Sequence, residues 1–521
     1  MDQAFTQDMT LGYSTDEPSI VLGSPMLDGE VLSDVRVTLP LSTTNRHGLI
    51  AGATGTGKTK TLQLMAGQLS AGGVPVFVAD VKGDLTGLAT PGDAADTRLQ
   101  ERVASLAWTF APAAHPVELL SLTGALGAPV RATVSSFGPL LLGKVMDLNE
   151  TQTSVLSMVF AYCDDHDLAL LDLEDLRTTL QYLTSDEGKP ALEAYGGMSK
   201  ATVGVLLRSL VTMEQEGIGD FFGEPAFEVE DLLRTTPEGA GVISILELAD
   251  VMAKPRLFST FMLWMLAQLY QELPEAGDLP RPKLAFFFDE AHLLFDDASD
   301  ALMEQIELTA RLIRSKGVGV YFVTQSPTDV PSSVLSQLGN RVQHALRAFT
   351  PQDADDLRKT ARTFPKTEHY DVEETITSLG IGEALVTLLT AKGVPSPLAA
   401  TRLIPPDSRM APADPEVLES LINGSPLRVK YLEAPDRESA HEILSARIAA
   451  AKEAAAPPPT VTVEGPKGEK RRRSTTPKKR TSASPEKSNT QRALEAGLKT
   501  VSSSEGQRTI RVLFGTLFGK R

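Results

Sequence analysis

The 521-residue chain lacks the features of several special classes of protein. Its single cysteine, Cys163, can form neither an internal disulfide nor a cysteine-based zinc site. No run of about 18 apolar residues provides a transmembrane helix. The start of the chain is acidic and polar, without the basic and apolar regions of a secretory signal. We therefore expect a cytoplasmic protein.

Positive charge is scarce outside the last part of the chain. The net charge is −17, yet residues 457–521 hold 15 Lys and Arg against 5 Asp and Glu, so the preceding residues are more acidic than the whole. Binding to a nucleic-acid backbone depends on clustered Lys and Arg. An acidic body does not favour such a partner, and we expect any contact with DNA at a local basic surface such as a pore or the tail.

Apolar runs that alternate with helical patterns predict an α/β core with a mostly parallel sheet. The predicted strands lie at residues 31–39, 47–51, 74–79, 241–246, 283–288, 318–323, 342–349 and 383–389. Apolar spacing without strand patterns predicts an inserted α-helical subdomain. The expected organisation is an exposed N-terminal segment with short strands at 1–45, the core at 46–136 and 237–433, the helical insertion at 137–236 and a charged helix at 434–456. A disordered basic linker at 457–492 and an amphipathic helix at 493–521 follow.

The strongest motif is a glycine-rich segment between a predicted strand and a predicted helix. It matches G-x-x-x-x-G-K-[ST] over Gly52, Ala53, Thr54, Gly55, Thr56, Gly57, Lys58 and Thr59. Glycines let the backbone N–H groups converge on phosphate oxygens, and the helix start adds its own unpaired N–H groups. Lys58 is expected at the β- and γ-phosphates and Thr59 at Mg²⁺, with Thr61 also in the nucleotide-binding set. The flanking strand and helix argue against an ordinary glycine-rich turn.

Two acids follow the predicted strand at 283–288. Asp289 stands where a strand-end carboxylate holds Mg²⁺ in P-loop NTPases, and Glu290 is placed to act as general base on the attacking water. Gln325 follows the next strand, where it could orient water or sense the γ-phosphate. An acidic pair or a glutamine at a strand end is often an ordinary polar cap, so these assignments depend on the phosphate loop.

The arginines leave more than one interpretation open. Arg311 and Arg314 share one face of a predicted helix with Glu307, which is compatible with a solvated ion pair. The alternative makes Arg314 a finger that stabilises transition-state charge, with Arg347 as the second candidate. The sequence does not decide whether the finger acts within its own subunit or on a neighbour. The segment from Asp80 to Asp84 lies beside the site or forms a simple turn.

The combined order of these motifs resembles the HerA–FtsK group of P-loop ATPases, most closely bacterial HerA-like proteins with a helicase-type C-terminal domain. The resemblance rests on Asn45–Ile50 leading into the phosphate loop, Asp80–Asp84, Phe288–His292, Arg311–Gly319 and Val323–Gln325. It implies a RecA-like sheet, ATP hydrolysis with Mg²⁺, ring-shaped homo-oligomers (often hexamers) and translocation on duplex DNA. It also implies that Arg314 is a finger acting in trans.

One difference from HerA helicases concerns the start of the chain. Those proteins carry a β-barrel before the ATPase core, whereas fewer than 52 residues precede the phosphate loop here. We therefore expect no dedicated nuclease partner. An ATP-driven switch or motor acting on proteins, or at a membrane surface through the C-terminal helix with its flanking Arg and Lys, remains the alternative function.

Overall fold

A single large sheet forms the centre of the fold. The computed structural model describes residues 2–455 apart from 252–253, 278, 296–299, 434 and 436. The 13 strands follow the order β2-β1-β13-β12-β11-β4-β10-β9-β5-β8-β6-β7, and β3 pairs with β1. They are β1 (Ser19–Leu27), β2 (Glu30–Val31), β3 (Val37–Pro40), β4 (Gly48–Ala51), β5 (Val76–Asp80), β6 (Val117–Ser121), β7 (Ala128–Pro129), β8 (Ile243–Glu247), β9 (Leu284–Phe288), β10 (Val318–Thr324), β11 (Asn340–His344), β12 (Glu383–Thr387) and β13 (Ala399–Leu403).

The strands from β11 through β7 pair in parallel, and the antiparallel strands lie on the side of β12, β13 and β1. The predicted α/β class with a mostly parallel sheet is confirmed. The strand before the phosphate loop, β4, is separated from the strand before the acids, β9, by β10 alone. This is the RecA-like order that the family resemblance implies.

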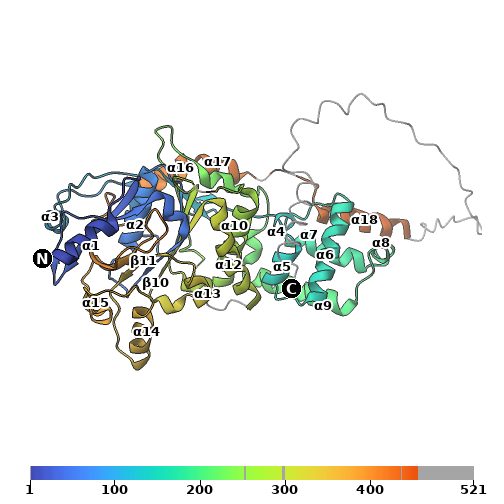
Figure 1. Cartoon of the computed structure of the whole chain (residues 1–521). Coiled ribbons are helices and arrows are strands. Elements are labelled where there is room, and N and C mark those ends of the chain that lie inside the picture. Colours follow the sequence, from blue (N-terminus) through green and yellow to red (C-terminus); the bar gives the residue numbers. More distant parts are fainter. Residues whose placement is uncertain are drawn as a thin grey trace, which may run out of the picture.

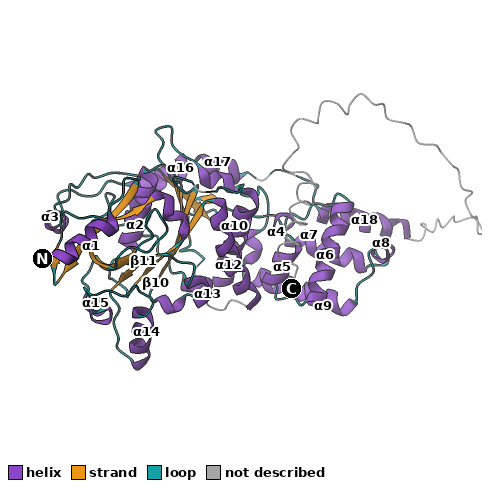
Figure 2. Ribbon diagram, in the orientation of Figure 1, coloured by secondary structure: helices purple, strands orange, loops and turns teal. Residues whose placement is uncertain are grey.

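Helices cover both faces of the sheet (Figure 1, Figure 2). They are α1 (Gln3–Tyr13), α2 (Lys58–Ala71), α3 (Thr97–Ser105), α4 (Val134–Phe137), α5 (Pro139–Val145), α6 (Glu150–Asp165), α7 (Leu173–Thr184), α8 (Lys189–Ala194), α9 (Lys200–Gln215), α10 (Pro255–Glu272), α11 (His292–Phe295), α12 (Asp300–Ile313), α13 (Ser332–Leu335), α14 (Pro351–Ala361), α15 (Val372–Ser378), α16 (Pro415–Gly424), α17 (Pro426–Leu432) and α18 (Ala440–Ala455). Short 3₁₀ helices are η1 (Leu41–Arg46), η2 (Thr86–Ala89), η3 (Ile218–Phe221), η4 (Val229–Leu233), η5 (Arg314–Lys316) and η6 (Pro327–Asp329).

Strand β9 shows why the central strands read as continuous apolar runs. Phe286 and Phe288 join the core that contains α10, while Phe287 joins the core that contains α2. All five residues of β9 are buried because both faces of the sheet are covered. Burial of each phenylalanine stabilises the fold by about 1.5–3 kcal/mol. The central strands, and the residues that follow their carboxyl ends, are therefore held in fixed positions.

The inserted helices form a lobe beside the sheet, and α18 returns to it from the far end of the described chain (Figure 1). Thr178 Oγ1 lies 2.8 Å from His441 Nδ1, and the N–H of Ala440 donates to the carbonyl of Ala169 at 2.9 Å. The α18 helix therefore packs along α7 rather than extending alone.

Several expectations about local structure are wrong. The first residues form α1, capped by Asp2, with Phe5, Met9 and Tyr13 buried, where the sequence analysis expected an exposed start. The strand expected at 342–349 begins at Asn340 and ends at His344. Strands β1, β6, β7 and β13 were not predicted, and the strand expected at 31–39 is divided between the end of β2 and most of β3. The linker at 457–492 and the helix at 493–521 lie outside the described residues. Within residues 2–455, no described helix is long and apolar enough to cross a membrane.

Candidate active site

The glycine-rich bend after β4 is fastened to both neighbouring strands. The N–H of Gly52 donates to the carbonyl of Thr324 at 3.2 Å, and the N–H of Ala53 donates to the carbonyl of Ala345 at 2.9 Å. Gly57, at φ +115°, precedes the first residue of α2. A Cβ on Gly52 would lie 2.5 Å from the Cβ of His344, so the close approach to β11 requires glycine there.

Two contacts that were not predicted from the sequence join the glycine-rich bend and the start of α2 to β11 and to the residue before β12. Thr61 Oγ1 lies 2.9 Å from Nε2 of the buried His344, and the N–H of Gly382 donates to the carbonyl of Thr56 at 3.0 Å. Burial, together with the charge of Lys58, lowers the pKa of His344 to about 4, so its imidazole is neutral at pH 7. The observed contacts of Thr61 fasten α2 to β11.

Lys58 is buried, and its side chain turns back onto the glycine-rich bend. Its Nζ donates to the carbonyl of Gly52 at 2.7 Å and lies 3.3 Å from the carbonyl of Ala53. Burial lowers the pKa of Lys58, while the charges of Glu290 and Asp289 act in the opposite direction. The ammonium group and the two carboxylates therefore share one electrostatic environment.

Sheet register places the paired acids beside the bend. Thr324 of β10 pairs with Ala51 of β4, and Phe322 of β10 pairs with Phe288 of β9. Adjacent strands lie about 4.8 Å apart, so the end of β9 is roughly 10 Å from the end of β4. That spacing suits a triphosphate with its metal ion.

The carboxylates themselves are almost inaccessible. Asp289 is 2% exposed and Glu290 is 6% exposed, and Glu290 adopts a left-handed backbone conformation at φ +47°. Burial, followed by the charges of Glu290 and Asp80, raises the pKa of Asp289 to about 7. Asp289 Oδ1 accepts a hydrogen bond from the N–H of Glu290 at 3.0 Å.

The residues fit a magnesium–nucleotide complex. Among the described residues, Asp289 Oδ2 and Glu290 Oε2 are buried with no hydrogen-bond partner. Orphaned carboxylate oxygens are costly to bury unless a ligand satisfies them. The described residues contain no group of three or more His, Cys, Asp or Glu arranged around a metal ion. Mg²⁺ usually takes one or two carboxylates plus substrate phosphates and water, and this donor set is of that kind.

The segment from Asp80 to Asp84 is both a turn and a neighbour of the acids. The Asp80 carboxylate accepts hydrogen bonds from the N–H groups of Lys82, Gly83 and Leu85 at 2.9–3.0 Å. This turn directs Lys82 Nζ to Glu290 Oε1 at 2.5 Å. Glu247, in register with Asp80 on the next strand, extends the row of carboxylates and was not predicted.

The end of β10 lies between the bend and the acids, because β10 is the strand between β4 and β9. Thr324 is buried, and its Oγ1 donates to Asp329 Oδ2 at 2.6 Å. Gln325 is exposed at the same edge, one residue beyond the pairing with β4.

The two candidate finger arginines, Arg314 and Arg347, lie at opposite ends of the parallel strands. Arg314 is in η5, before the first residue of β10, whereas the phosphate loop meets the last residue of that strand. Seven residues of strand span about 20 Å, so Arg314 is remote from the phosphate loop of its own chain. Arg347 lies at the phosphate-loop edge, and its Nη1 donates to the carbonyl of Thr377 at 2.5 Å.

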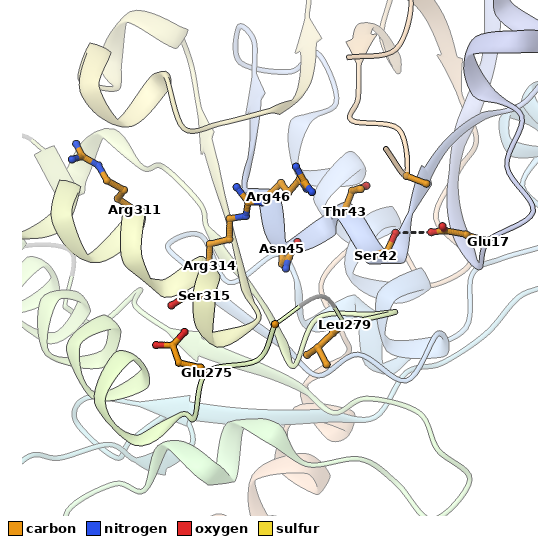
Figure 3. Close-up of a pocket in the computed structure, with 12 residues that line it drawn as sticks. Glu17, Ser42, Thr43, Asn45, Arg46, Glu275, Leu279, Arg311, Arg314 and Ser315 are labelled. Atoms are coloured by element: carbon orange, nitrogen blue, oxygen red, sulfur yellow. Dashed lines mark hydrogen bonds between the residues drawn. The ribbon is translucent and has the colours of Figure 1, made fainter. Parts of the chain in front are cut away.

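A cavity of about 620 Å³ surrounds Arg314 at the amino edge of the sheet. Arg46, Arg311, Glu17 and Glu275 also line it. The α-helix predicted to hold both Arg311 and Arg314 ends earlier than expected, because α12 ends at Ile313 and Arg314 begins the 3₁₀ turn η5. Arg314 points toward Asn45 and Arg46, while Arg311 points away from them (Figure 3).

Solved structures of other bacterial proteins resemble this chain weakly. The unbound conjugative coupling protein TrwB shares 14% identity over 78% of this chain and 93% of its own, with a TM-score of 0.49. TrwB with ADP and Mg²⁺ shares 14% identity over 77% of this chain and 97% of its own, with a TM-score of 0.48. VirB4 of Thermoanaerobacter pseudethanolicus shares 14% identity over 78% of this chain and 99% of its own, with a TM-score of 0.44.

The family assignment comes from the sequence itself. No curated protein matches the chain. The family described as Helicase HerA-like C-terminal matches residues 27–521, which include the phosphate loop, the paired acids and both candidate arginines. The chain therefore belongs to the helicase HerA-like C-terminal family of P-loop ATPases.

Proposed function

We propose that the chain hydrolyses ATP with Mg²⁺ as part of a homo-oligomeric ring, a hexamer, that translocates on DNA. The observation that carries the proposal is the register of the sheet, which places the glycine-rich bend with Lys58 on one side of β10 and the buried carboxylates of Asp289 and Glu290 on the other. A bend that converges N–H groups on phosphates, beside buried carboxylates, is the arrangement that phosphoryl transfer requires.

Each residue has a separate role in this proposal. The bend from Gly52 to Thr59 binds the phosphates, and Lys58 leaves its carbonyl partners for the β- and γ-phosphates. Thr59 and Asp289 would hold Mg²⁺, which would neutralise charge on the phosphate oxygens. Glu290 takes a proton from the attacking water through Oε2, and Gln325 orients that water.

The positions of the arginines support a ring. About 20 Å of strand β10 separate Arg314 from the phosphate loop of its own chain. Arg314 therefore completes a site only when the amino ends of the strands in one subunit face the carboxyl ends of the strands in the next. Such a head-to-tail contact closes into a ring when the rotation between subunits permits. We assign Arg314 as the finger in trans, with the cavity around it facing the neighbouring nucleotide.

A subunit-mixing experiment tests this assignment. Lys58→Ala removes phosphate binding, and Arg314→Ala removes the finger, so each variant alone should have little turnover. In a random equal mixture, about one quarter of interfaces pair an intact loop with an intact arginine, and ATP hydrolysis should recover to that extent. Arg208→Ala, at an exposed arginine of α9 in the inserted lobe and outside that cavity, is the matched control. Absence of recovery in rings of verified size would exclude action in trans.

The DNA substrate requires its own measurement. We expect duplex DNA to stimulate ATP hydrolysis at low salt and to lose this effect as salt rises, because the contact is to phosphates. Indifference to duplex and single-stranded DNA at every salt concentration would refute translocation while leaving ATP hydrolysis intact.

The acidity of residues 1–456 favours one alternative, an ATP-driven switch or motor acting on proteins or at a membrane surface. Co-sedimentation with anionic liposomes, compared between the full chain and a chain lacking residues 493–521, tests the membrane form. Equal sedimentation of both chains would reject it.

A further inference from the structure

The ion pair between Lys82 and Glu290 joins two motifs that are far apart in the sequence. Lys82 Nζ lies 2.5 Å from Glu290 Oε1. The lysine side chain is 47% exposed, whereas the glutamate side chain is 8% exposed. One partner therefore reaches in from solvent to a carboxylate that is otherwise enclosed.

The turn after β5 fixes where this lysine emerges. Three N–H groups of the turn converge on the Asp80 carboxylate, and Gly83 adopts φ +70°. Hydrogen bonds of this kind between an aspartate and the following backbone define a tight turn. Since β5 pairs with β9, the turn lies directly beside the end of the acid-bearing strand.

The two oxygens of Glu290 have different surroundings. Oε1 is held by Lys82, whereas Oε2 has no hydrogen-bond partner among the described residues. Nδ1 of His292 is 3.4 Å from Oε2, without the geometry of a hydrogen bond. An arrangement with one oxygen held and the other open is that of a catalytic base oriented by a third group.

We propose that Lys82 is a positioning residue for Glu290: its ammonium group holds Oε1, so that Oε2 is presented as the proton acceptor. This inference rests on the proposed role of Glu290 in ATP hydrolysis. Lys82 also places one positive charge among the carboxylates of Asp289, Asp84 and Glu290, which act on it electrostatically. Without Lys82, Glu290 would rotate away from Asp289 because the two like charges repel each other.

The test compares Lys82→Met with Lys82→Arg, each in the parent and in a Glu290→Gln background. Lys430→Met is the matched control, because Lys430 is a 40% exposed lysine paired with Glu228 and Asp231 away from the site. The measurements are kcat, KM for ATP, the Kd of a fluorescent ATP analogue with Mg²⁺, and the thermal midpoint without nucleotide.

We expect Lys82→Met to lower kcat by about 10- to 100-fold, the loss typical of a misplaced reacting group, with Kd within about twofold of the parent. Lys82→Arg should recover most of kcat, and Lys430→Met should retain it. In the Glu290→Gln background Lys82→Met should lower kcat no further. Without nucleotide, Lys82→Met should lower the thermal midpoint of the parent more than that of Glu290→Gln.

Four results would overturn the inference. Unchanged kcat in folded Lys82→Met would show that Glu290 needs no positioning. An equal loss in the Glu290→Gln background, or a rise in Kd that matches the fall in kcat, would show that Lys82 acts on the nucleotide directly. Equal turnover of Glu290→Gln and the parent would remove the proposed role of Glu290 and this inference with it, while the thermal comparison would still report the ion pair.

Discussion

The carboxyl group of Glu247 provides a quantitative test of the charge crowding at the candidate site. Glu247 ends β8, pairs in register with Asp80 and is 6% exposed, and its Oε1 has no hydrogen-bond partner within the described part of the chain. Burial, followed by the charges of Asp80, Asp250 and Asp84, raises the pKa of Glu247 from 4.5 to about 8. The folded protein therefore keeps this group protonated at pH 7, whereas the unfolded chain ionises it.

The sign and size of the effect on stability follow from this difference. A group whose pKa is higher in the folded state contributes stability that is fully present below its unfolded pKa, here 4.5, and is lost as pH rises through about 8. Each pKa unit corresponds to about 1.36 kcal/mol, so the loss is on the order of 5 kcal/mol above pH 8. Near pH 5 it is below about 1 kcal/mol. Glu247→Gln removes the ionisable group and with it the whole loss.

Thermal unfolding without nucleotide or Mg²⁺, measured at pH 5 and at pH 8.5, reports this difference. Glu247→Gln should raise the thermal midpoint at pH 8.5 and change it little at pH 5. The exposed Glu416 in α16 supplies the control, since Glu416→Gln should leave both midpoints unchanged. A gain of equal size at both pH values, or a loss at pH 8.5, would refute the account of a buried carboxyl surrounded by like charges.

Three further predictions concern the site and the tail. Glu290→Gln should bind an ATP analogue as the parent does and lose 10²- to 10⁴-fold in turnover, the usual contribution of a general base, as measured by steady-state hydrolysis and equilibrium binding. Gly52→Ala should abolish nucleotide binding in a folded protein, because its Cβ would lie 2.5 Å from that of His344; retained affinity would show that the bend can move away from β11. A chain ending at Ala455 should keep basal ATP hydrolysis and lose part of its stimulation by DNA, because it lacks the 15 Lys and Arg of residues 457–521.

The sequence alone was sufficient to locate the motifs that follow the carboxyl ends of the buried strands. Strands β4, β9 and β10 are covered on both faces, so each appears as an apolar run, and the polar residues that follow each run mark the functional edge. Parallel strands present their carboxyl ends at one edge. The spatial relation between the phosphate loop and Asp289 could therefore be predicted without knowing which strands are neighbours.

Contacts that depend on the neighbours themselves could not be predicted. Thr61 and His344 are 283 positions apart, and their hydrogen bond exists because β11 pairs with β4. Lys82 and Glu290 are 208 positions apart and meet because β5 pairs with β9. The α1 helix did carry a local signal, since Phe5, Met9 and Tyr13 recur every four residues, but that stripe lies in an otherwise polar segment.

Strand β10 joins the two halves of the proposed catalytic unit. Its last residue pairs with the strand before the phosphate loop, and its first residue follows Arg314 and η5. A residue fixed at the amino end of a parallel strand cannot reach the carboxyl end without unfolding that strand, so conformational change within one subunit does not bring Arg314 to its own nucleotide. If Arg314 is the finger, the sheet therefore requires a second copy of the chain for hydrolysis. Each subunit would then offer one edge to either neighbour, which is the condition for a closed ring with equivalent sites.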